Sequence, residues 1–590
     1  MLKDLLSRIF GRTRCAHADV RSVVEDCLQQ GYRAQRAGER TLAERHYRHA
    51  LERDPANVDA HYLLGALLGE NGNTLEAAMH LDRALAGKPD FAEAHAARGN
   101  VYSMVNERRA AAASYEQALR LDPGHAVAHF NLALILQGDG RREDALHHFE
   151  KACALAPDLP DALKNLTLLQ IEFARFEEAQ SVLQRVLDGR PQHFDALKCM
   201  GFVLQKMHRP REALEQYLKA RALNGHDAEL LNNLGIVLQD LGRLDEAIAS
   251  YDAAIALEPD FALAIWHRSL AYLLRHDFAR GWPDYELRLV SADKPRRAIE
   301  YPRWDGTPLA GRRILVYAEQ GLGDEIMFAS CLPDVIAASA HCIIECSPRL
   351  ESVFRRSFPA ATVYAATDDR MVPQGVRDRG VDVQIPMGSL PLHLRRSRAD
   401  FPRHHGYLKA DSGLTEAWRA RLDRLGSGPK VGISWHGGTH KTRRPVRSIP
   451  LAQWTPILKT AGAHFADLQY TDCTAEIDAS CTAAGVSVHS WEETRSDYEQ
   501  TVALAAALDL VLSVCTAIIH LGGALGTPVW VMAPYSPEWR YGIAGESMPW
   551  YPSVRIFRQP EYGDWEPVIG KVAQSLRAMI GSLNTPPAER

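Results

Sequence analysis

The 590-residue sequence lacks any run of about 18 or more apolar residues, so no membrane-spanning helix is expected. Its formal net charge is only -5, which gives no electrostatic basis for binding nucleic acid. The first residues, MLKDLLSRIFGRTR, lack the apolar core and small-residue cleavage site of a secretory signal. This segment could form a short basic amphipathic helix that contacts a membrane surface peripherally, or a plain capping helix.

Paired cysteine motifs are also missing. The ten cysteines are scattered, mostly in apolar segments, and Cys342 and Cys346 are too far apart to form a CxxC pair. Scattered cysteines of this kind are typical of reduced structural thiols. The composition therefore predicts a cytoplasmic protein.

What the first half does contain is a 34-residue period. Prolines recur at this interval, with Gly225 in the one skipped position: Pro55, Pro89, Pro123, Pro157, Pro191 and Pro259. Alanines keep the same interval: Ala43, Ala77, Ala111, Ala145, Ala179, Ala213 and Ala247. An aromatic residue follows four positions after most of these alanines: Tyr47, Tyr115, Phe149, Tyr217 and Tyr251.

This period and these residue classes resemble the tetratricopeptide repeat. Small residues let the two helices of a hairpin approach closely, the aromatic fills the space beside the next hairpin, and proline ends the second helix. We therefore expect an α-solenoid of about seven repeats, with a partial eighth, over residues 24–290. Such arrays present a concave binding face, so a protein or glycan partner docked in this groove is expected.

The second half has a different pattern, in which short apolar strands alternate with helices. RILVYA, HCIIEC, TVYAA and VDVQIP read as four strands, and VGISWHGG, FADLQY, LDLVLSV and PVWVMAP read as four more. This alternation predicts parallel sheets covered on both faces, in two Rossmann-like lobes with a cleft between them. Ligands of such sheets bind at the carboxyl ends of the strands.

Four motifs of this half, taken together, are similar to the heptosyltransferase-type glycosyltransferases, and most of all to the bacterial branch that carries tetratricopeptide repeats ahead of the transferase. The motifs are GLGDEIMFASCLP, ISWHGG, RSIPL and SVCTAIIHLGGALGTPVWVMAP, and the similarity covers about residues 311–582. The resemblance implies a GT-B fold and transfer of a sugar from a nucleotide-sugar donor. It implies no cofactor and no metal, and the second half contains no convincing DxD-type metal motif.

The domain organisation that follows has five parts. We expect an N-terminal extension, the repeat superhelix, a packed linker, an N-terminal GT-B lobe and a C-terminal GT-B lobe with a final helix that crosses back to brace the first lobe. Packing at the linker is suggested by Trp282, Trp304, Pro302 and Pro308. The expected boundaries are 1–23, 24–290, 291–312, 313–428 and 429–590.

The first lobe offers a candidate catalytic group. Gly321, Leu322 and Gly323 form a turn between a strand and a helix, where backbone N–H groups suit an anion. Asp324 matches the aspartate that acts as acceptor base in the heptosyltransferases. An alternative is that Asp324 simply caps the helix by accepting backbone N–H bonds.

The second lobe offers candidate donor contacts. Arg447 matches the family's diphosphate-contacting cation, a role suited to a guanidinium because it can bind two phosphate oxygens, and Lys441 lies nearby in the same basic loop. A basic loop can also be plain solvated surface. Gln469 and Glu476 fall where the family contacts the nucleoside.

The stretch SVCTAIIHLGG departs from the family pattern. Where the family has Asp-Thr or Asp-Ser, with the acid contacting the donor sugar, this chain has Cys515 and Thr516. Thr516 and the N–H group of Ala517 remain able to hold phosphate, and His520, on the same helical face, could reach the donor or pack against the sheet. Loss of one carboxylate removes an acceptor for sugar hydroxyls but leaves the anion site.

Two other functions stay open at this point. The chain could be a non-catalytic adaptor or scaffold that retains a degenerate transferase fold, or a sensor that binds a phosphate sugar without transferring it. Replacement of Asp324 and Arg447 by alanine distinguishes the adaptor from the enzyme. An adaptor should tolerate both changes, whereas an enzyme should lose activity.

Overall fold

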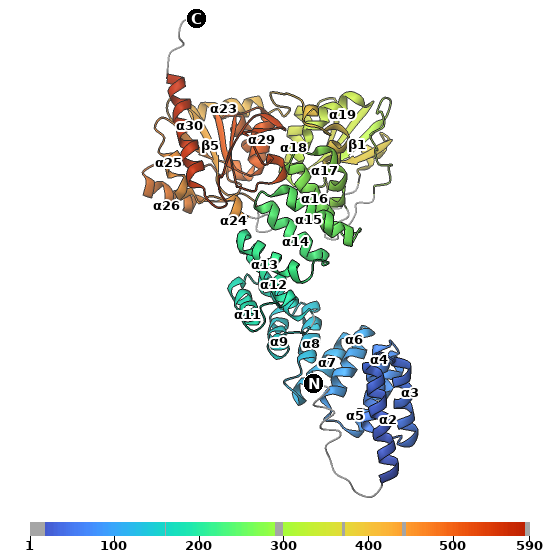
Figure 1. Cartoon of the computed structure of the whole chain (residues 1–590). Helices are drawn as coiled ribbons and strands as arrows, with labels where there is room; N and C mark the ends of the chain where they lie inside the picture. Colours follow the sequence, from blue (N-terminus) through green and yellow to red (C-terminus); the bar gives the residue numbers. More distant parts are fainter. Residues whose placement is uncertain (1–17, 160, 290–298, 368–371, 439–443, 585–590) are drawn as a thin grey trace. The chain divides into compact units, whose positions relative to one another are not determined.

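The computed structural model describes residues 18–159, 161–289, 299–367, 372–438 and 444–584 (Figure 1). The chain forms two compact units, Met1–Met207 and His208–Arg590, which we call unit 1 and unit 2. The basic N-terminal segment considered above as an amphipathic helix lies outside the described residues.

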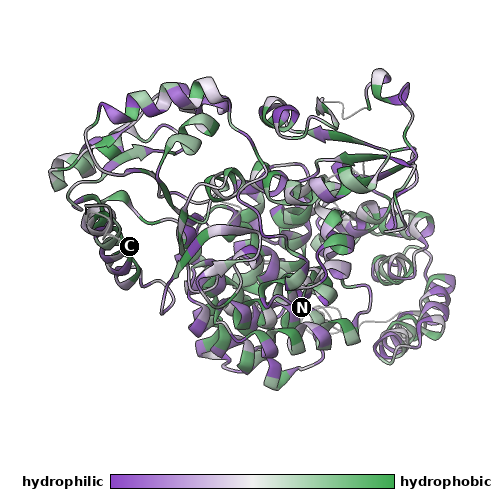
Figure 2. Cartoon of the chain, turned by 90° about the horizontal axis from the view of Figure 1, so that it is seen from above, coloured by the Kyte–Doolittle hydropathy of each residue, from purple (hydrophilic) through white to green (hydrophobic). Residues whose placement is uncertain are grey.

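Unit 1 consists of antiparallel helix hairpins, which confirms the repeats predicted from the 34-residue period. Figure 2 shows hydrophobic and hydrophilic residues alternating along the helices of the chain, as expected for helices that bury one side. Its helices are α2 (Ala18–Arg36), α3 (Arg40–Arg53), α4 (Val58–Glu70), α5 (Thr74–Gly87), α6 (Ala92–Met104), α7 (Arg108–Leu121), α8 (Ala126–Gly138), α9 (Arg142–Leu155), α10 (Ala162–Glu172), α11 (Phe176–Gly189) and α12 (Phe194–Lys206).

In several repeats the small residue and the aromatic pack against each other. A Cβ atom added to Gly99 would lie 2.5 Å from Cε1 of Tyr115, and one added to Gly235 would lie 2.4 Å from Cε1 of Tyr251. Both tyrosines are buried. Any larger residue at these glycines would therefore push the two helices of the hairpin apart.

Unit 2 begins with further repeat helices and continues into the strands of the second half. The helical part consists of α13 (Pro210–Leu223), α14 (Ala228–Asp240), α15 (Leu244–Leu257), α16 (Ala262–Leu274), α17 (Phe278–Tyr285) and the 3-10 turn η1 (Glu286–Leu289).

The first lobe of unit 2 is a four-stranded parallel sheet in the order β3-β2-β1-β4. Its strands are β1 (Arg313–Tyr317), β2 (His341–Cys346), β3 (Thr362–Ala365) and β4 (Val383–Pro386). The helical segments around them are α18 (Leu322–Phe328), η2 (Ala329–Cys331), α19 (Leu332–Ala338), η3 (Pro348–Leu350), α20 (Glu351–Ser357), α21 (Gln374–Arg377), η4 (Met387–Ser389), α22 (Leu390–Leu394) and η5 (Arg398–Asp400).

The second lobe is a seven-stranded sheet in the order β10-β11-β9-β8-β5-β6-β7, parallel except for the β10–β11 pair. Its strands are β5 (Lys430–Ser434), β6 (His464–Asp467), β7 (Val488–His489), β8 (Leu510–Val514), β9 (Val529–Ala533), β10 (Ser547–Met548) and β11 (Tyr551–Arg558). The helical segments are α23 (Ser412–Asp423), α24 (Arg444–Arg447), η7 (Leu451–Trp454), α25 (Thr455–Leu458), α26 (Thr474–Ala484), α27 (Glu493–Ser496), α28 (Tyr498–Ala507), α29 (Ala517–Leu525), η8 (Trp539–Tyr541) and α30 (Glu566–Asn584).

All eight strands read from the sequence are present, and the parallel α/β architecture of the second half is confirmed. The final helix differs from the prediction. Helix α30 packs on α25, η7 and β11 of the second lobe, and its Val568, Val572 and Leu576 are buried in that lobe's core. It therefore braces the second lobe.

One hydrophobic core runs through unit 2 from its last repeat helices into both lobes. It includes Leu273 and Trp282 of the helical part, Ile314 of the first sheet and Val511 of the second. The indole N–H of Trp282 donates to the carbonyl of Arg395, at 2.7 Å. The last repeat thus packs against the α/β part and shares its core, as Trp282 and Trp304 at the junction suggested.

Candidate functional site

A pocket of about 630 Å³ lies between the two lobes of unit 2. Its walls come from the segments that follow the carboxyl ends of seven strands, where parallel sheets bind ligands. The lining residues include Gly321 to Asp324 after β1, Arg349 after β2, Gly438 after β5, Gln469 after β6, Arg495 after β7, Thr516 after β8, and Glu538 and Arg540 after β9.

The first-lobe turn brings Asp324 to the pocket wall. Helix α18 begins at Leu322 with Gly321 as its N-cap residue, so Asp324 lies in the first turn of the helix and is not its N-cap residue. Its carboxylate instead accepts from the guanidinium of Arg540, whose Nε is 2.9 Å from Oδ1. The capping alternative for Asp324 is therefore wrong.

Gly323 allows the two lobes to touch. A Cβ atom at this position would lie 3.2 Å from both Cα and Cβ of Ala517 and 3.3 Å from Cδ2 of His520. The first turns of α18 and α29 therefore meet at the pocket, and the two helices lie side by side in Figure 1. Helix N-termini carry unsatisfied N–H groups and a partial positive charge, which favours an anion between them.

Four charged side chains form a continuous row along the pocket. Arg540 contacts Asp324 and also donates to Glu538, with 3.1 Å between Arg540 Nη1 and Glu538 Oε2. Glu538 Oε1 in turn accepts from Arg447 Nη1, at 2.5 Å. Burial alone would lower the pKa of Arg540, but Asp324 and Glu538 outweigh this effect and hold the pKa above its usual value.

Arg447 reaches the pocket from α24, because the loop after β5 folds tightly beneath it. Its guanidinium also donates to the backbone carbonyl of Cys515. A Cβ atom at Gly437 would lie 2.8 Å from the Arg447 carbonyl oxygen and 3.0 Å from that of Cys515, so only glycine fits there. The backbone N–H of Gly437 donates to Ser448 Oγ, at 3.0 Å. Gly437, the first glycine of ISWHGG, thus helps to position Arg447.

Cys515 does not line the pocket. Its side chain is 1% exposed and packs in the core of unit 2, and burial raises the pKa of its thiol to about 12. Only its carbonyl oxygen takes part in the site, through Arg447. A buried protonated thiol is a poor nucleophile. The sequence placed Cys515 among the candidate substrate-binding residues, because it stands where the resembled family has its sugar-contacting acid. In the structure its side chain packs in the core instead.

Thr516, Ala517 and His520 do line the pocket. Thr516 Oγ1 lies 2.9 Å from Ser513 Oγ and makes no capping bond to α29, which leaves the first N–H groups of that helix without a side-chain cap. His520 is 4% exposed, and its Nδ1 lies 3.2 Å from the Tyr551 hydroxyl. Burial lowers its pKa to about 3, so His520 is neutral at pH 7.

The structure separates the two residues expected at the nucleoside. Gln469 lines the pocket; its amide is satisfied when the oxygen accepts from the backbone N–H groups of Trp435 and His436. Glu476 does not line the pocket. It accepts from the Trp435 indole at 3.0 Å, from His436 Nε2 at 2.6 Å and from the Leu451 N–H at 3.1 Å, so it holds the start of the basic loop in place.

Glu476 also belongs to a group of three side chains with metal-ligating atoms. The ligand atoms of His436, Cys473 and Glu476 lie within 4.8 Å of one another. The Glu476 carboxylate is already engaged by its N–H donors, and these hydrogen bonds hold its pKa below the usual value although burial opposes them. We therefore interpret the group as a hydrogen-bonded support for the loop.

Sequence reasoning missed several charged residues of the pocket. Arg349 contributes from the first lobe, and Arg495 and Glu538 contribute from the second. The segment PEWRYG follows a predicted strand, so its position at a carboxyl strand end was the available signal for Glu538. Lys441, the reserve cation of the basic loop, lies outside the described residues.

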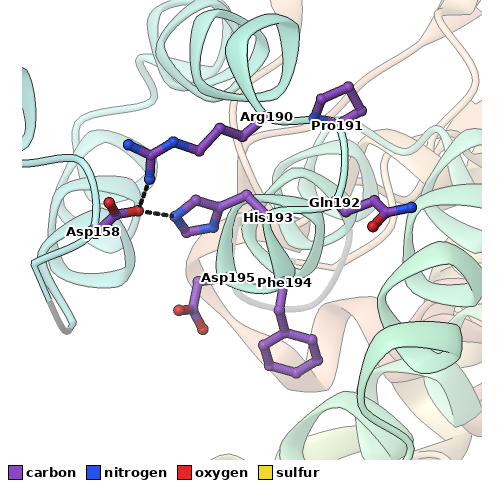
Figure 3. A pocket seen from close by; sticks show the side chains of 7 residues that line it. All are labelled: Asp158, Arg190, Pro191, Gln192, His193, Phe194 and Asp195. Carbon is purple, nitrogen blue, oxygen red and sulfur yellow. Dashed lines mark hydrogen bonds and ion pairs between the residues drawn. The ribbon is translucent and has the colours of Figure 1, made fainter.

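A second depression, of about 690 Å³, lies in unit 1 between consecutive repeats. Figure 3 shows the carboxylate of Asp158 facing the side chains of Arg190 and His193. The hydrogen bond from Arg190 lowers the pKa of Asp158. These pairs tie the turn after α9 to the turn between α11 and α12, which gives them a structural role.

Comparison with known proteins supports the repeats. Sequence profiles of the tetratricopeptide repeat match residues 46–78, 96–160, 136–198 and 228–261. The chain therefore carries tetratricopeptide repeats, a module for binding other proteins. Among the described residues, none of the helices is both long and apolar enough to cross a membrane.

Protein FlbA of Caulobacter vibrioides is 36% identical over 337 residues, which are 55% of this chain and 56% of that protein. The chain thus spans about half the length of this curated relative. Solved repeat proteins also match. YrrB, described as a TPR protein with an unusual peptide-binding site, is 24% identical over 33% of this chain and all of its own, with a TM-score of 0.28. Pseudomonas aeruginosa PilF is 25% identical over 36% of this chain and 96% of its own, with a TM-score of 0.31.

Proposed function

We propose that this chain is a metal-independent glycosyltransferase of the GT-B type, which transfers a sugar from a nucleotide-sugar donor to a protein or glycan acceptor docked by the repeats. The observation that carries the proposal is the convergence on one pocket of two helix N-termini, at α18 and α29, and two guanidiniums, of Arg447 and Arg540. A diphosphate leaving group needs this combination of N–H groups and fixed cations.

In this proposal each lobe has a separate task. The second lobe holds the donor: Arg447 and the first turn of α29 bind the diphosphate, and Gln469 faces the nucleoside. The first lobe holds the acceptor, and Asp324 takes the proton of the acceptor hydroxyl. The acceptor oxygen bonds to the sugar while the bond between the sugar and the diphosphate breaks, and the nucleoside diphosphate leaves with that electron pair. His520 does not supply charge, because it is neutral at pH 7.

A protein acceptor agrees with the repeats, because tetratricopeptide arrays bind protein partners. The described cysteines agree with a cytoplasmic setting, since all nine are free thiols and seven of them are buried.

A non-catalytic adaptor is the second candidate. It is favoured by the ion pairs of Arg447 and Arg540 with carboxylates of the chain itself, and by the loss at Cys515 of the acid that the resemblance leads one to expect. In an adaptor, this row of charges would serve only to hold the two lobes together.

The deciding experiment incubates the full chain with a panel of nucleotide sugars and measures release of the nucleoside diphosphate, with and without acceptor candidates. D324N keeps the size of the side chain but cannot take a proton, so turnover should fall about 100-fold or more while donor binding remains. D378N, at an exposed position of the same lobe, is the matched control and should turn over like the wild type. Donor binding without turnover in any combination would favour the adaptor or a sensor.

A further inference from the structure

Glu538 holds the position between two guanidiniums that an oxyanion would take. One of its carboxylate oxygens accepts from Arg447 at 2.5 Å, and the other accepts from Arg540 at 3.1 Å. The two arginines come from different segments, α24 and η8, and both line the pocket. A phosphate group binds guanidiniums through the same pair of oxygen acceptors.

Within this row Glu538 is the side chain most able to leave. It is 34% exposed, whereas the side chains of Arg447 and Arg540 are 12% and 14% exposed. Its neighbours Trp539 and Tyr541 are buried, so the backbone is held while the carboxylate can turn toward solvent. Moving this partly exposed carboxylate into water costs less than moving either buried guanidinium.

We propose that Glu538 is an internal stand-in for the donor diphosphate, and that donor binding displaces its carboxylate from Arg447 and Arg540. This inference rests on the proposed function, because it concerns the same pocket. The exchange keeps both guanidiniums neutralised before and after binding. It makes Glu538 a positioning residue that prevents other, weaker anions from occupying the site.

The exchange also affects Asp324. Arg540 contacts Asp324 and Glu538 together, so a diphosphate that draws Arg540 toward itself weakens its bond to Asp324. The Asp324 carboxylate is then free to accept a hydrogen bond from the acceptor hydroxyl. The acceptor base is thus fully available only when the donor is present.

Calorimetric titration of the full chain with inorganic pyrophosphate tests the displacement. E538Q removes the internal anion at constant side-chain size and should bind pyrophosphate about tenfold more tightly than the wild type, whereas loss of a merely structural residue would weaken binding or leave it unchanged. R447A and R540A should both weaken binding. E546Q is the control, since Glu546 forms exposed pairs with Arg555 and Lys571 and should leave the affinity as it is.

E538D provides a second variant in case E538Q fails to fold, because its shorter carboxylate cannot bridge both guanidiniums and its affinity should also rise. Equal or weaker binding by the folded variants, with clear binding by the wild type, would overturn the displacement and leave the proposed function standing. If neither the wild type nor the Glu538 variants bind pyrophosphate, both the displacement and the diphosphate site are wrong.

Discussion

Arg540 of the second lobe and Asp324 of the first lobe form an ion pair across the pocket, with 2.9 Å between Arg540 Nε and Asp324 Oδ1. Both side chains are mostly buried, at 14% and 20% exposure. The pair therefore couples the relative position of the lobes to the charge state of the site.

Loss of this pair should destabilise unit 2. R540A leaves Asp324 and Glu538 without their shared cation, so we expect a loss on the order of 3 kcal/mol in the free energy of unfolding. The double variant D324N/R540A should lose less than the sum of the single changes, which denaturant unfolding of the full chain can measure. R555A, which breaks an exposed pair with Glu546, should cost less than about 1 kcal/mol. Equal effects of R540A and R555A would contradict the coupling.

The two glycines of the first-lobe turn should respond differently to alanine. At Gly323 a Cβ atom meets the backbone of Ala517 at 3.2 Å, so G323A should lower the melting temperature by forcing α18 away from α29. At Gly321 the nearest atom is Asp324 Oδ2 at 3.7 Å, so G321A should fold like the wild type. Its added methyl group lies at the pocket wall and should weaken nucleoside diphosphate binding. A G321A variant that binds normally would show that the ligand does not approach this turn.

Stability should fall as the pH rises, because of Glu325. This residue lies beside Asp324 in the sequence, but it is 5% exposed and does not line the pocket. Burial raises its pKa to about 7, although the Ser347 N–H bond opposes the shift. The Glu325 carboxyl loses its proton near pH 4.5 in the unfolded chain and only near pH 7 in the folded chain. The contribution of Glu325 to the free energy of unfolding is therefore fully present below about pH 4.5 and is lost as the pH rises to about 7.

E325Q removes this titration while keeping an acceptor for Ser347. It should be more stable than the wild type at pH 8, by up to about 3 kcal/mol, and the advantage should disappear near pH 4.5. Melting temperatures of both proteins across this range provide the measurement. A difference that does not depend on pH would show that Glu325 is not protonated in the folded state.

The boundary of the α/β part can be tested by truncation. Trp282 and Tyr285 of α17 pack against Trp539, with ring centroids 5.4 Å and 5.6 Å apart. A chain starting at residue 208 keeps these contacts and should remain folded and bind nucleoside diphosphate like the full chain. A chain starting at residue 291 exposes these aromatic surfaces and should aggregate. A folded, binding-competent chain from residue 291 would show that the last repeat is separable from the site.

Much of the fold could be predicted, because it depends on the spacing of small and aromatic residues in the repeats and on the short apolar runs of the strands. The repeats follow from spacing, and the eight strands follow from short apolar runs. Strand β11 was missed because its SVRIF core lies within a stretch rich in tryptophan, proline and glycine. Helix α30 was assigned to the wrong partner because an amphipathic helix does not indicate which groove its apolar side will fill.

The site was predictable in outline but not in its contacts. The turn at Gly321 and the cation Arg447 lie on the pocket as the motifs suggested. Cys515 and Glu476 do not, because a motif fixes the position of a residue along a loop but not the direction of its side chain. The pairing of Asp324 with Arg540 joins residues 216 positions apart, and no local spacing encodes such a contact.

The central claim is that the pocket between the lobes binds a diphosphate. Thermal unfolding of the full chain with nucleoside diphosphates and nucleotide sugars tests it most directly, because a ligand that binds only the folded state stabilises it. At saturation at least one nucleotide should raise the melting temperature by several degrees in the wild type and in R555A, and by clearly less in R447A. No shift with any nucleotide, or an equal shift in R447A, would contradict the claim.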